Sequence, residues 1–85
     1  MIKPRKFRKK PIVIEAFQWT EDITPQWWRD ISGDFKINTA TGSVFIPTLE
    51  GTMEARPQDF IIQGVNKEIY PCKADIFNKT YEEIK

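Results

Sequence analysis

The stretch from residue 52 to residue 81 constrains the fold most, because it alternates apolar and polar residues and then changes to a helical period. Alternation of this kind is typical of half-buried strands, and the Pro and Gly residues between the runs mark turns. The pattern predicts strands over residues 52–56, 59–63 and 68–70. Apolar residues at helical spacing then predict a closing helix over residues 73–84.

The first strand is predicted over residues 12–19, which begin with β-branched residues and then alternate. Phe17 and Trp19 need cover on one face of this strand, so we expect a helix to pack against it. The face that we expect to turn toward the core is the other one, which carries Ile12, Ile14, Ala16 and Gln18.

A short helix and a hairpin complete the pattern. We expect Thr24 to cap the helix, Pro25 to take its first position and Gly33 to end it in a left-handed conformation. Residues 35–38 and 43–46 read as the two strands of a hairpin. The sequence therefore predicts an α+β fold. It would be a small twisted antiparallel sheet or half-barrel of about five to six short strands, with one short helix after the first strand and a C-terminal helix.

The residue types that carry most enzyme chemistry are scarce. The 85 residues contain one cysteine, Cys72, and no histidine. An intrachain disulfide is therefore excluded, and we expect neither a metal site nor a cofactor. Glu54, Asp59 and Glu68 lie on or near adjacent predicted strands, but a solvated surface is the more common place for such carboxylates. We therefore expect that the chain is not an enzyme.

The formal net charge of +1 hides a strong asymmetry. Residues 1–10 form a basic arm that has no acidic residue and carries a charge of +6. We expect residues 11–85 to form a single globular domain, which holds seven basic and twelve acidic residues. Such an arm either contacts phosphate groups or lies on the acidic body of its own chain. The arm residues taken as candidate contacts are Lys3, Arg5, Lys6, Arg8, Lys9 and Lys10.

Trp27 and Trp28 are the second candidate site. Consecutive helical residues point about 100° apart, so a short helix does not readily bury both rings in one core. We expect one ring in the core and the other partly exposed, where it would contact a partner or stack on a ligand.

Two segments resemble a family of small uncharacterised phage and prophage proteins. Residues 7–19, FRKKPIVIEAFQW, are similar to its F-R-K-K-P-x-V-I-E-A-x-Q-W start, and residues 49–81 are similar to its P-G-D-W-I-I-x-G-V-x-G-E-x-Y-P-C-K-like segment. Gln58 and Lys67 stand where the family pattern has Gly, and Ala74 replaces a Pro. If those glycines serve turns with positive φ, the turns here must differ, or Asn66 must take the left-handed position. The resemblance implies a phage or prophage accessory protein in the cytoplasm of a bacterial host.

Three function classes follow from these observations. The first is a non-enzymatic binding protein that engages a host protein or a small nucleotide-like signal, for example in counter-defence. The second is a nucleic-acid-binding protein that uses the basic arm, and the third is a phage structural or assembly component. We expect no membrane span, because no apolar run approaches the roughly 20 residues that one needs. A homodimer would be a second source of stability for so small a core.

Overall fold

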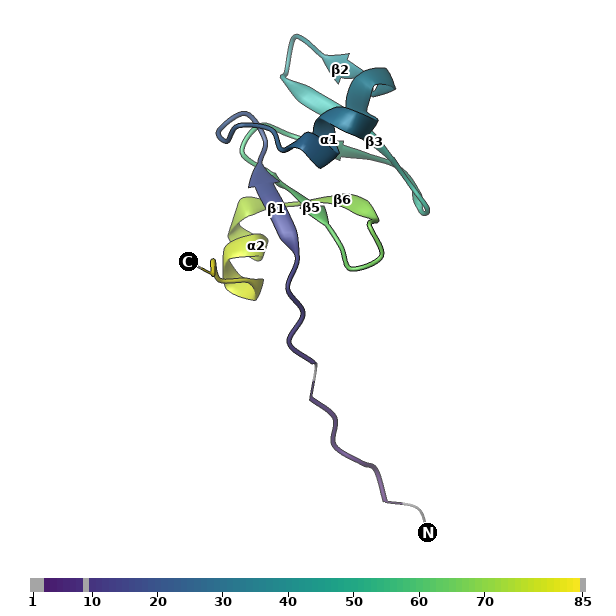
Figure 1. The fold of residues 1–85 in the computed structure, drawn as a ribbon, viewed down its shortest axis with the longest axis vertical. Helices are drawn as coiled ribbons and strands as arrows, with labels where there is room; N and C mark the ends of the chain where they lie inside the picture. Colours follow the sequence, from purple (N-terminus) through teal and green to yellow (C-terminus); the bar gives the residue numbers. More distant parts are fainter. Residues whose placement is uncertain (1–2, 9, 85) are drawn as a thin grey trace.

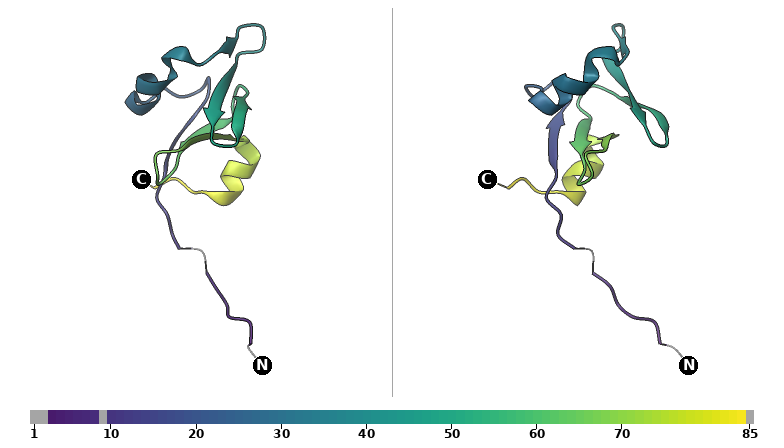
Figure 2. Two further views of the ribbon diagram at one scale, coloured as in Figure 1. Left: turned by 90° about the vertical axis from the view of Figure 1, so that its right-hand side faces the viewer. Right: turned by 45° about the vertical axis from the view of Figure 1, so that its right-hand side comes forward.

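The computed structural model describes residues 3–8 and 10–84, and over this part the chain is an α+β fold (Figure 1). The elements follow in the order β1 (Glu15–Gln18), α1 (Gln26–Ile31), a 3-10 turn (Ser32–Asp34), β2 (Ile37–Asn38), β3 (Ser43–Thr48), β4 (Gly51–Ala55), β5 (Phe60–Gln63), β6 (Ile69–Cys72) and α2 (Ala74–Thr80). The predicted fold class is confirmed. The strands divide between two small sheets, and one helix lies mid-chain and one at the C-terminal end (Figure 2).

Both sheets are antiparallel and three-stranded. The first has the order β1-β5-β6, and the second has the order β2-β3-β4. Strand β6 packs against both β3 and β4 and so joins the sheets. The core between the sheets is formed by residues from β1, α1, β3, β4 and β5: Phe17, Trp28, Val44, Ile46, Ala55 and Ile61.

The expected inward face of the first strand was wrong. Phe17 is 4% exposed and packs in the core, paired across the ladder with the fully buried Ile61. Ala16 and its neighbour Ile62 lie on the opposite face of the sheet, together with Phe60, which contacts α2. Strand β1 therefore buries Phe17 on one face and leaves Ala16 half-buried on the other, although it lies at the edge of its sheet.

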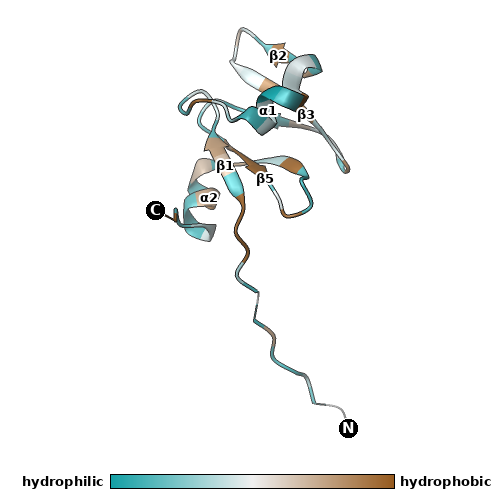
Figure 3. Ribbon diagram, viewed as in Figure 1, coloured by the Kyte–Doolittle hydropathy of each residue, from teal (hydrophilic) through white to brown (hydrophobic). Residues whose placement is uncertain are grey.

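Strand β1 also begins later than predicted, because its partner ends. Glu15 pairs with Gln63, and the next residue of the partner chain, Gly64, already belongs to the turn after β5. Residues 12–14 continue in an extended conformation without a partner strand, which leaves Val13 73% exposed. Figure 3 shows this segment as an apolar stretch that leads into β1.

Both helices are shorter than predicted. In α1, Pro25 occupies the capping position, no side chain caps the helix, and Arg29 donates to the Thr24 carbonyl. The helix passes directly into the 3-10 turn, so Gly33 does not take the expected left-handed conformation. In α2, the helix ends at Thr80 because Tyr81 has an extended backbone (φ −124°, ψ 151°).

Strands β3 and β6 extend through a proline, where the sequence predicted that they end. Pro47 pairs with Thr52 and Pro71 with Ile61. Proline lacks an N–H group and is accepted where one side of the strand is free. Strand β6 lies at the edge of its sheet, and β2 pairs with β3 only at Ser43 and Val44, so both prolines have such a free side.

Two residues that stand where the resembled pattern has Gly have a positive φ. Gln58 has φ 76° and Lys67 has φ 64°, so the expectation that the turns differ or that Asn66 becomes left-handed was wrong. Pro57 and Gln58 are the central residues of a turn closed by an Asp59 N–H to Arg56 carbonyl bond of 3.0 Å. A proline followed by a residue with positive φ is the type II arrangement, which favours Gly at the second place.

We expect the substitutions Gln58→Gly and Lys67→Gly to raise the free energy of unfolding by about 1 kcal/mol each, because a left-handed L-residue is strained relative to glycine. Urea unfolding followed by tryptophan fluorescence measures the change. The matched control is Asn66→Gly, which lies in the same turn as Lys67 without a positive φ. If Asn66→Gly raises the free energy of unfolding as much as Lys67→Gly does, this explanation is contradicted.

Candidate binding surfaces

The two tryptophans of α1 lie in an aromatic cluster. Trp28 is 3% exposed, and its ring meets the rings of Phe17, Trp19 and Phe35 edge-on at centroid distances of 5.5, 5.6 and 5.5 Å. Trp27 is partly buried and contacts the Phe17 ring at 5.6 Å. Trp28 is therefore the core residue, and Trp27 is the more exposed of the two.

The indole N–H groups of the cluster differ in their partners. The Trp19 Nε1 donates to the Gly42 carbonyl at 2.8 Å. The Trp27 Nε1 is buried without an acceptor in the described part of the chain. Only carbon edges of Trp27 are thus offered at the surface, which fits an apolar contact better than a hydrogen-bonded one. A binding role for Trp27 or Trp28 stays a prediction.

The described part of the basic arm, residues 3–8 and 10, runs away from the domain in every view (Figures 1 and 2). Its described cations, at positions 3, 5, 6, 8 and 10, are exposed, and Lys9 lies outside the described residues. The Arg5 guanidinium lies over the Phe7 ring at 5.3 Å. Among the described residues, none of the arm's charges forms an ion pair with the acidic body of the domain.

An apolar groove, here called the hairpin groove, lies between the β3–β4 turn and the β5–β6 turn. It has a volume of about 640 Å³ and is lined mainly by Ile31, Phe35, Pro47, Leu49, Met53 and Ile69, with Lys67, Glu50 and Glu68 among its polar lining residues. Leu49 is 101% exposed. The groove was not predicted from the sequence, because its residues come from separate elements, and Leu49 in a turn is the only local signal.

A second groove, here called the α2 groove, lies on the opposite face of the first sheet and has a volume of about 470 Å³. Its apolar part combines the extended segment before β1 with Phe60 and α2. Phe77 stacks on Phe60 at 4.0 Å and contacts Tyr81 at 4.9 Å. Four carboxylates also line it, those of Glu15, Asp22, Glu82 and Glu83.

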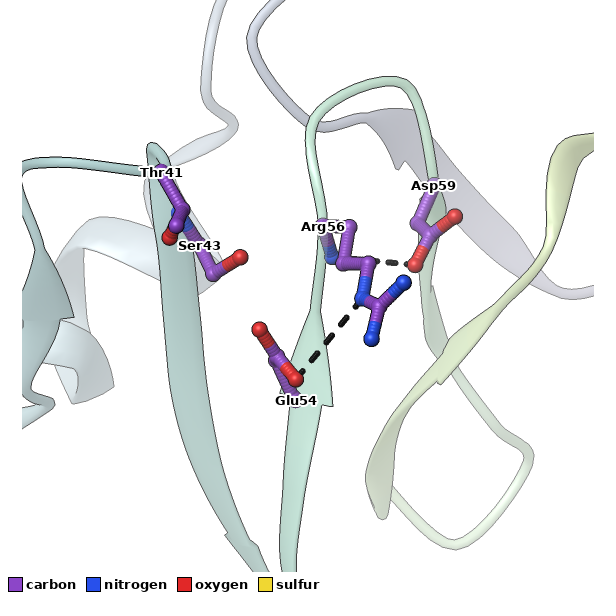
Figure 4. Close-up of polar contacts among 5 residues, drawn as sticks. All are labelled: Thr41, Ser43, Glu54, Arg56 and Asp59. Carbon is purple, nitrogen blue, oxygen red and sulfur yellow. Dashed lines mark hydrogen bonds and ion pairs between the residues drawn. The ribbon is translucent and has the colours of Figure 1, made fainter.

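The carboxylates considered for acid–base chemistry have structural contacts, and Figure 4 shows those of Glu54 and Asp59 with Arg56. Asp59 accepts from the Arg56 backbone N–H at 2.9 Å and so caps its own turn. Glu54 lies 3.8 Å from Arg56, and Glu68 accepts from the Asn66 N–H at 2.8 Å in a different turn. Within residues 3–8 and 10–84, no three Cys, Asp or Glu side chains are placed to hold a metal ion.

The environment of Cys72 keeps its thiol protonated. Burial raises the pKa of this thiol, and the charges of Asp59 and Asp75 raise it further. A thiolate is the nucleophilic form of cysteine. The position of Cys72 therefore gives no support to thiol chemistry.

The surroundings of Tyr70 predict that the domain loses stability in alkali. Burial, a hydrogen bond with Tyr81 and the charge of Tyr81 raise the pKa of Tyr70 from 10.0 to about 12. The folded state thus favours the neutral phenol, so its contribution to stability is complete below pH 10 and is lost as the pH rises toward 12. We expect urea midpoints to fall across this window, and to fall less in Tyr70→Phe. An equal fall in both proteins would exclude Tyr70 as the cause.

Comparisons with family models, with curated proteins and with solved structures gave no match to this chain. Neither helix in the described part of the chain has the length and apolar character that crossing a membrane requires.

Proposed function

We propose that this chain is a non-catalytic accessory binding protein of phage or prophage origin, which engages a host protein in the bacterial cytoplasm. The observation that carries the proposal is the hairpin groove with Leu49 exposed beside it. Contiguous apolar surface of this kind marks interaction sites in small soluble domains. The phage origin, the cytoplasmic setting and a role in counter-defence rest on the sequence resemblance alone.

The turn that carries Leu49 is held in place before any partner arrives. The Thr48 Oγ1 donates to the Gly51 carbonyl at 2.6 Å and accepts from the Glu50 N–H at 3.1 Å. Gly51 has φ 104°, a conformation that suits glycine. A leucine on such a preformed turn loses little conformational entropy on binding.

The lining of the groove favours a protein over a nucleotide-like signal. Lys67 is its one cation, and Glu50 and Glu68 lie among its other polar residues. Phosphate groups need several cations or backbone N–H donors, whereas an apolar side chain of a partner protein needs the Ile, Leu and Met surface that is present.

The test is a pull-down from host lysate with three proteins: the unchanged chain, Leu49→Asp and Ile23→Asp. Ile23 is 91% exposed and lines none of the grooves described above, so it is the matched control. We expect one captured protein to be lost with Leu49→Asp alone. With that protein purified, Leu49→Asp should weaken binding by about tenfold or more, and the heat capacity change on binding should be negative.

Melting temperatures within a degree or two of each other, roughly what surface changes give, show that both variants fold. Equal capture by Leu49→Asp and by the unchanged chain would refute the proposal. If a nucleotide raises the melting temperature of the unchanged chain but not that of Leu49→Asp, the ligand of the groove is a small-molecule signal and not a protein.

Nucleic-acid binding by the basic arm is the second candidate, supported by the arm's projection away from the acidic body. We expect deletion of residues 1–10 to abolish binding to a generic duplex, and the double substitution Arg5→Ala, Arg8→Ala to lower the slope of log K against log salt by about 2. Binding that is unchanged by salt or by the deletion would exclude this role.

A further inference from the structure

We propose that the α2 groove receives the basic arm of a second copy of this chain, so that two copies exchange arms. The groove is formed by residues 12–16, Phe60, α2 and the residues after it. Of the basic arm, the part that the structure describes comprises residues 3–8 and 10, and it precedes the groove residue Ile12 in the chain.

The apolar surface of the groove calls for an apolar side chain in its occupant. Val13 is 73% exposed, Ile12 48% and Ile84 74%, although they lie around the stacked rings of Phe60 and Phe77. Exposed β-branched residues beside an aromatic stack are a surface that an aromatic or aliphatic side chain covers favourably.

The charge of the groove selects a cationic occupant. Glu15, Asp22, Glu82 and Glu83 all line it, and no Lys or Arg is found among the described residues that do so. Opposite charges across an interface fix the partner and the orientation, and they speed the encounter.

The arm has both features. It carries Lys3, Arg5, Lys6 and Arg8 around a single aromatic residue, Phe7, whose side chain is 82% exposed. It contains no acidic residue. Its cations therefore match the four carboxylates of the groove, and Phe7 supplies the apolar side chain.

The direction of the arm favours the groove of a second copy over its own. Ile12 and Val13 form part of the groove, and the chain before them leads away from it, so that the protein is 58 Å long (Figure 1). Pro11 biases Lys10 toward an extended backbone, which opposes a reversal at this point. Two copies that meet about a twofold axis beside the edge strand β1 would each place an arm over the partner's groove.

The first experiment measures the dimer dissociation constant of the full chain by sedimentation. We expect a dimer at low salt that dissociates as the salt approaches about 1 M, where charges are screened within about 3 Å. Glu82→Lys with Glu83→Lys, and separately Phe7→Ala, should each weaken the dimer by about tenfold. The control is Glu21→Lys with Asp34→Lys, which makes the same charge change at exposed positions outside both grooves and should weaken the dimer less than about threefold.

A second experiment distinguishes exchange from an arm that folds back on its own chain. Copies labelled with normal nitrogen and with heavy nitrogen are mixed and cross-linked by a carbodiimide. We expect cross-links between arm lysines and Glu82 or Glu83 in which one peptide comes from a normal chain and the other from a heavy chain. Links within one isotope only, a monomer at every concentration, or a dimer indifferent to both groove and arm variants would each overturn the proposal. Because the α2 groove shares no residue with the hairpin groove, partner capture through Leu49 should survive Glu82→Lys with Glu83→Lys.

Discussion

Replacing Trp28 by alanine is expected to remove about 3–5 kcal/mol from the free energy of unfolding. Trp28 is 3% exposed, and three other aromatic rings contact its faces and edges at about 5.5 Å. Truncation leaves a cavity where those rings met, and a core this small has few other side chains that could move in to fill the cavity. A domain of this size has a total stability of roughly 4–13 kcal/mol, so the expected loss is a large fraction of the total. Urea unfolding and near-ultraviolet circular dichroism measure the effect.

Trp27→Ala is the matched control for this prediction. Trp27 is its neighbour on the same helix but is only partly buried, and it contacts the cluster through Phe17. Its removal also eliminates a buried N–H group that has no acceptor in the described residues. We expect a loss of about 1–2 kcal/mol, near the centre of the range for single substitutions. If both variants lose the same stability, the division of roles between the two rings is wrong.

The sequence was sufficient to predict that one of these rings is central, but it did not identify which. An apolar stripe gives the spacing of the residues that share a helix face. Which of two neighbouring residues points to the core depends on where the helix begins. Here α1 begins at Gln26, one residue after the expected start, and rings from β1 and from Phe35 close around Trp28. Those contacts join residues that are far apart in the sequence, so the spacing of residues within the helix does not predict them.

The strands were predicted well where turn residues separate alternating runs. Pro57-Gln58 and Gly64 bound β5, and the predicted and observed strands differ there by one residue. The face of β1 was predicted wrongly because this strand buries Phe17 on one side and lies under α2 with the other. Alternation shows which face of a strand is buried when only one face is apolar. When both faces carry apolar residues, it does not show which of them points to the core.

The candidate surfaces were the least predictable features. The hairpin groove combines Ile31, Leu49 and Ile69, which are far apart in sequence, and it exists because two turns project past the sheets. The α2 groove depends on where neighbouring elements end: β5 ends before it can pair with residues 12–14, and α2 ends at Thr80. Composition indicated only the basic arm.

The second large effect is expected for Phe77→Ala, which should release α2 from the sheet. This helix has seven residues and no side-chain cap, and helices of this length do not persist alone in water. Its contact with the sheet rests on the stack of Phe77 on Phe60 at 4.0 Å. Removing a partly exposed ring of this kind should lower the free energy of unfolding by about 2 kcal/mol, less than the loss for a fully buried one.

Hydrogen exchange separates the loss of α2 from a general loss of stability. We expect the Phe77 and Tyr81 amides, which donate to Lys73 and Phe77, to lose their protection, while amides of the fully buried Ile61 keep most of theirs. Ile76→Ala is the control on the same helix, because Ile76 is 52% exposed, and it should change little. Since Phe77 also lines the α2 groove, its removal should weaken arm exchange and spare partner capture through Leu49. Retained protection in α2 would mean that contacts other than the stack hold the helix, and the groove would then keep its shape without Phe77.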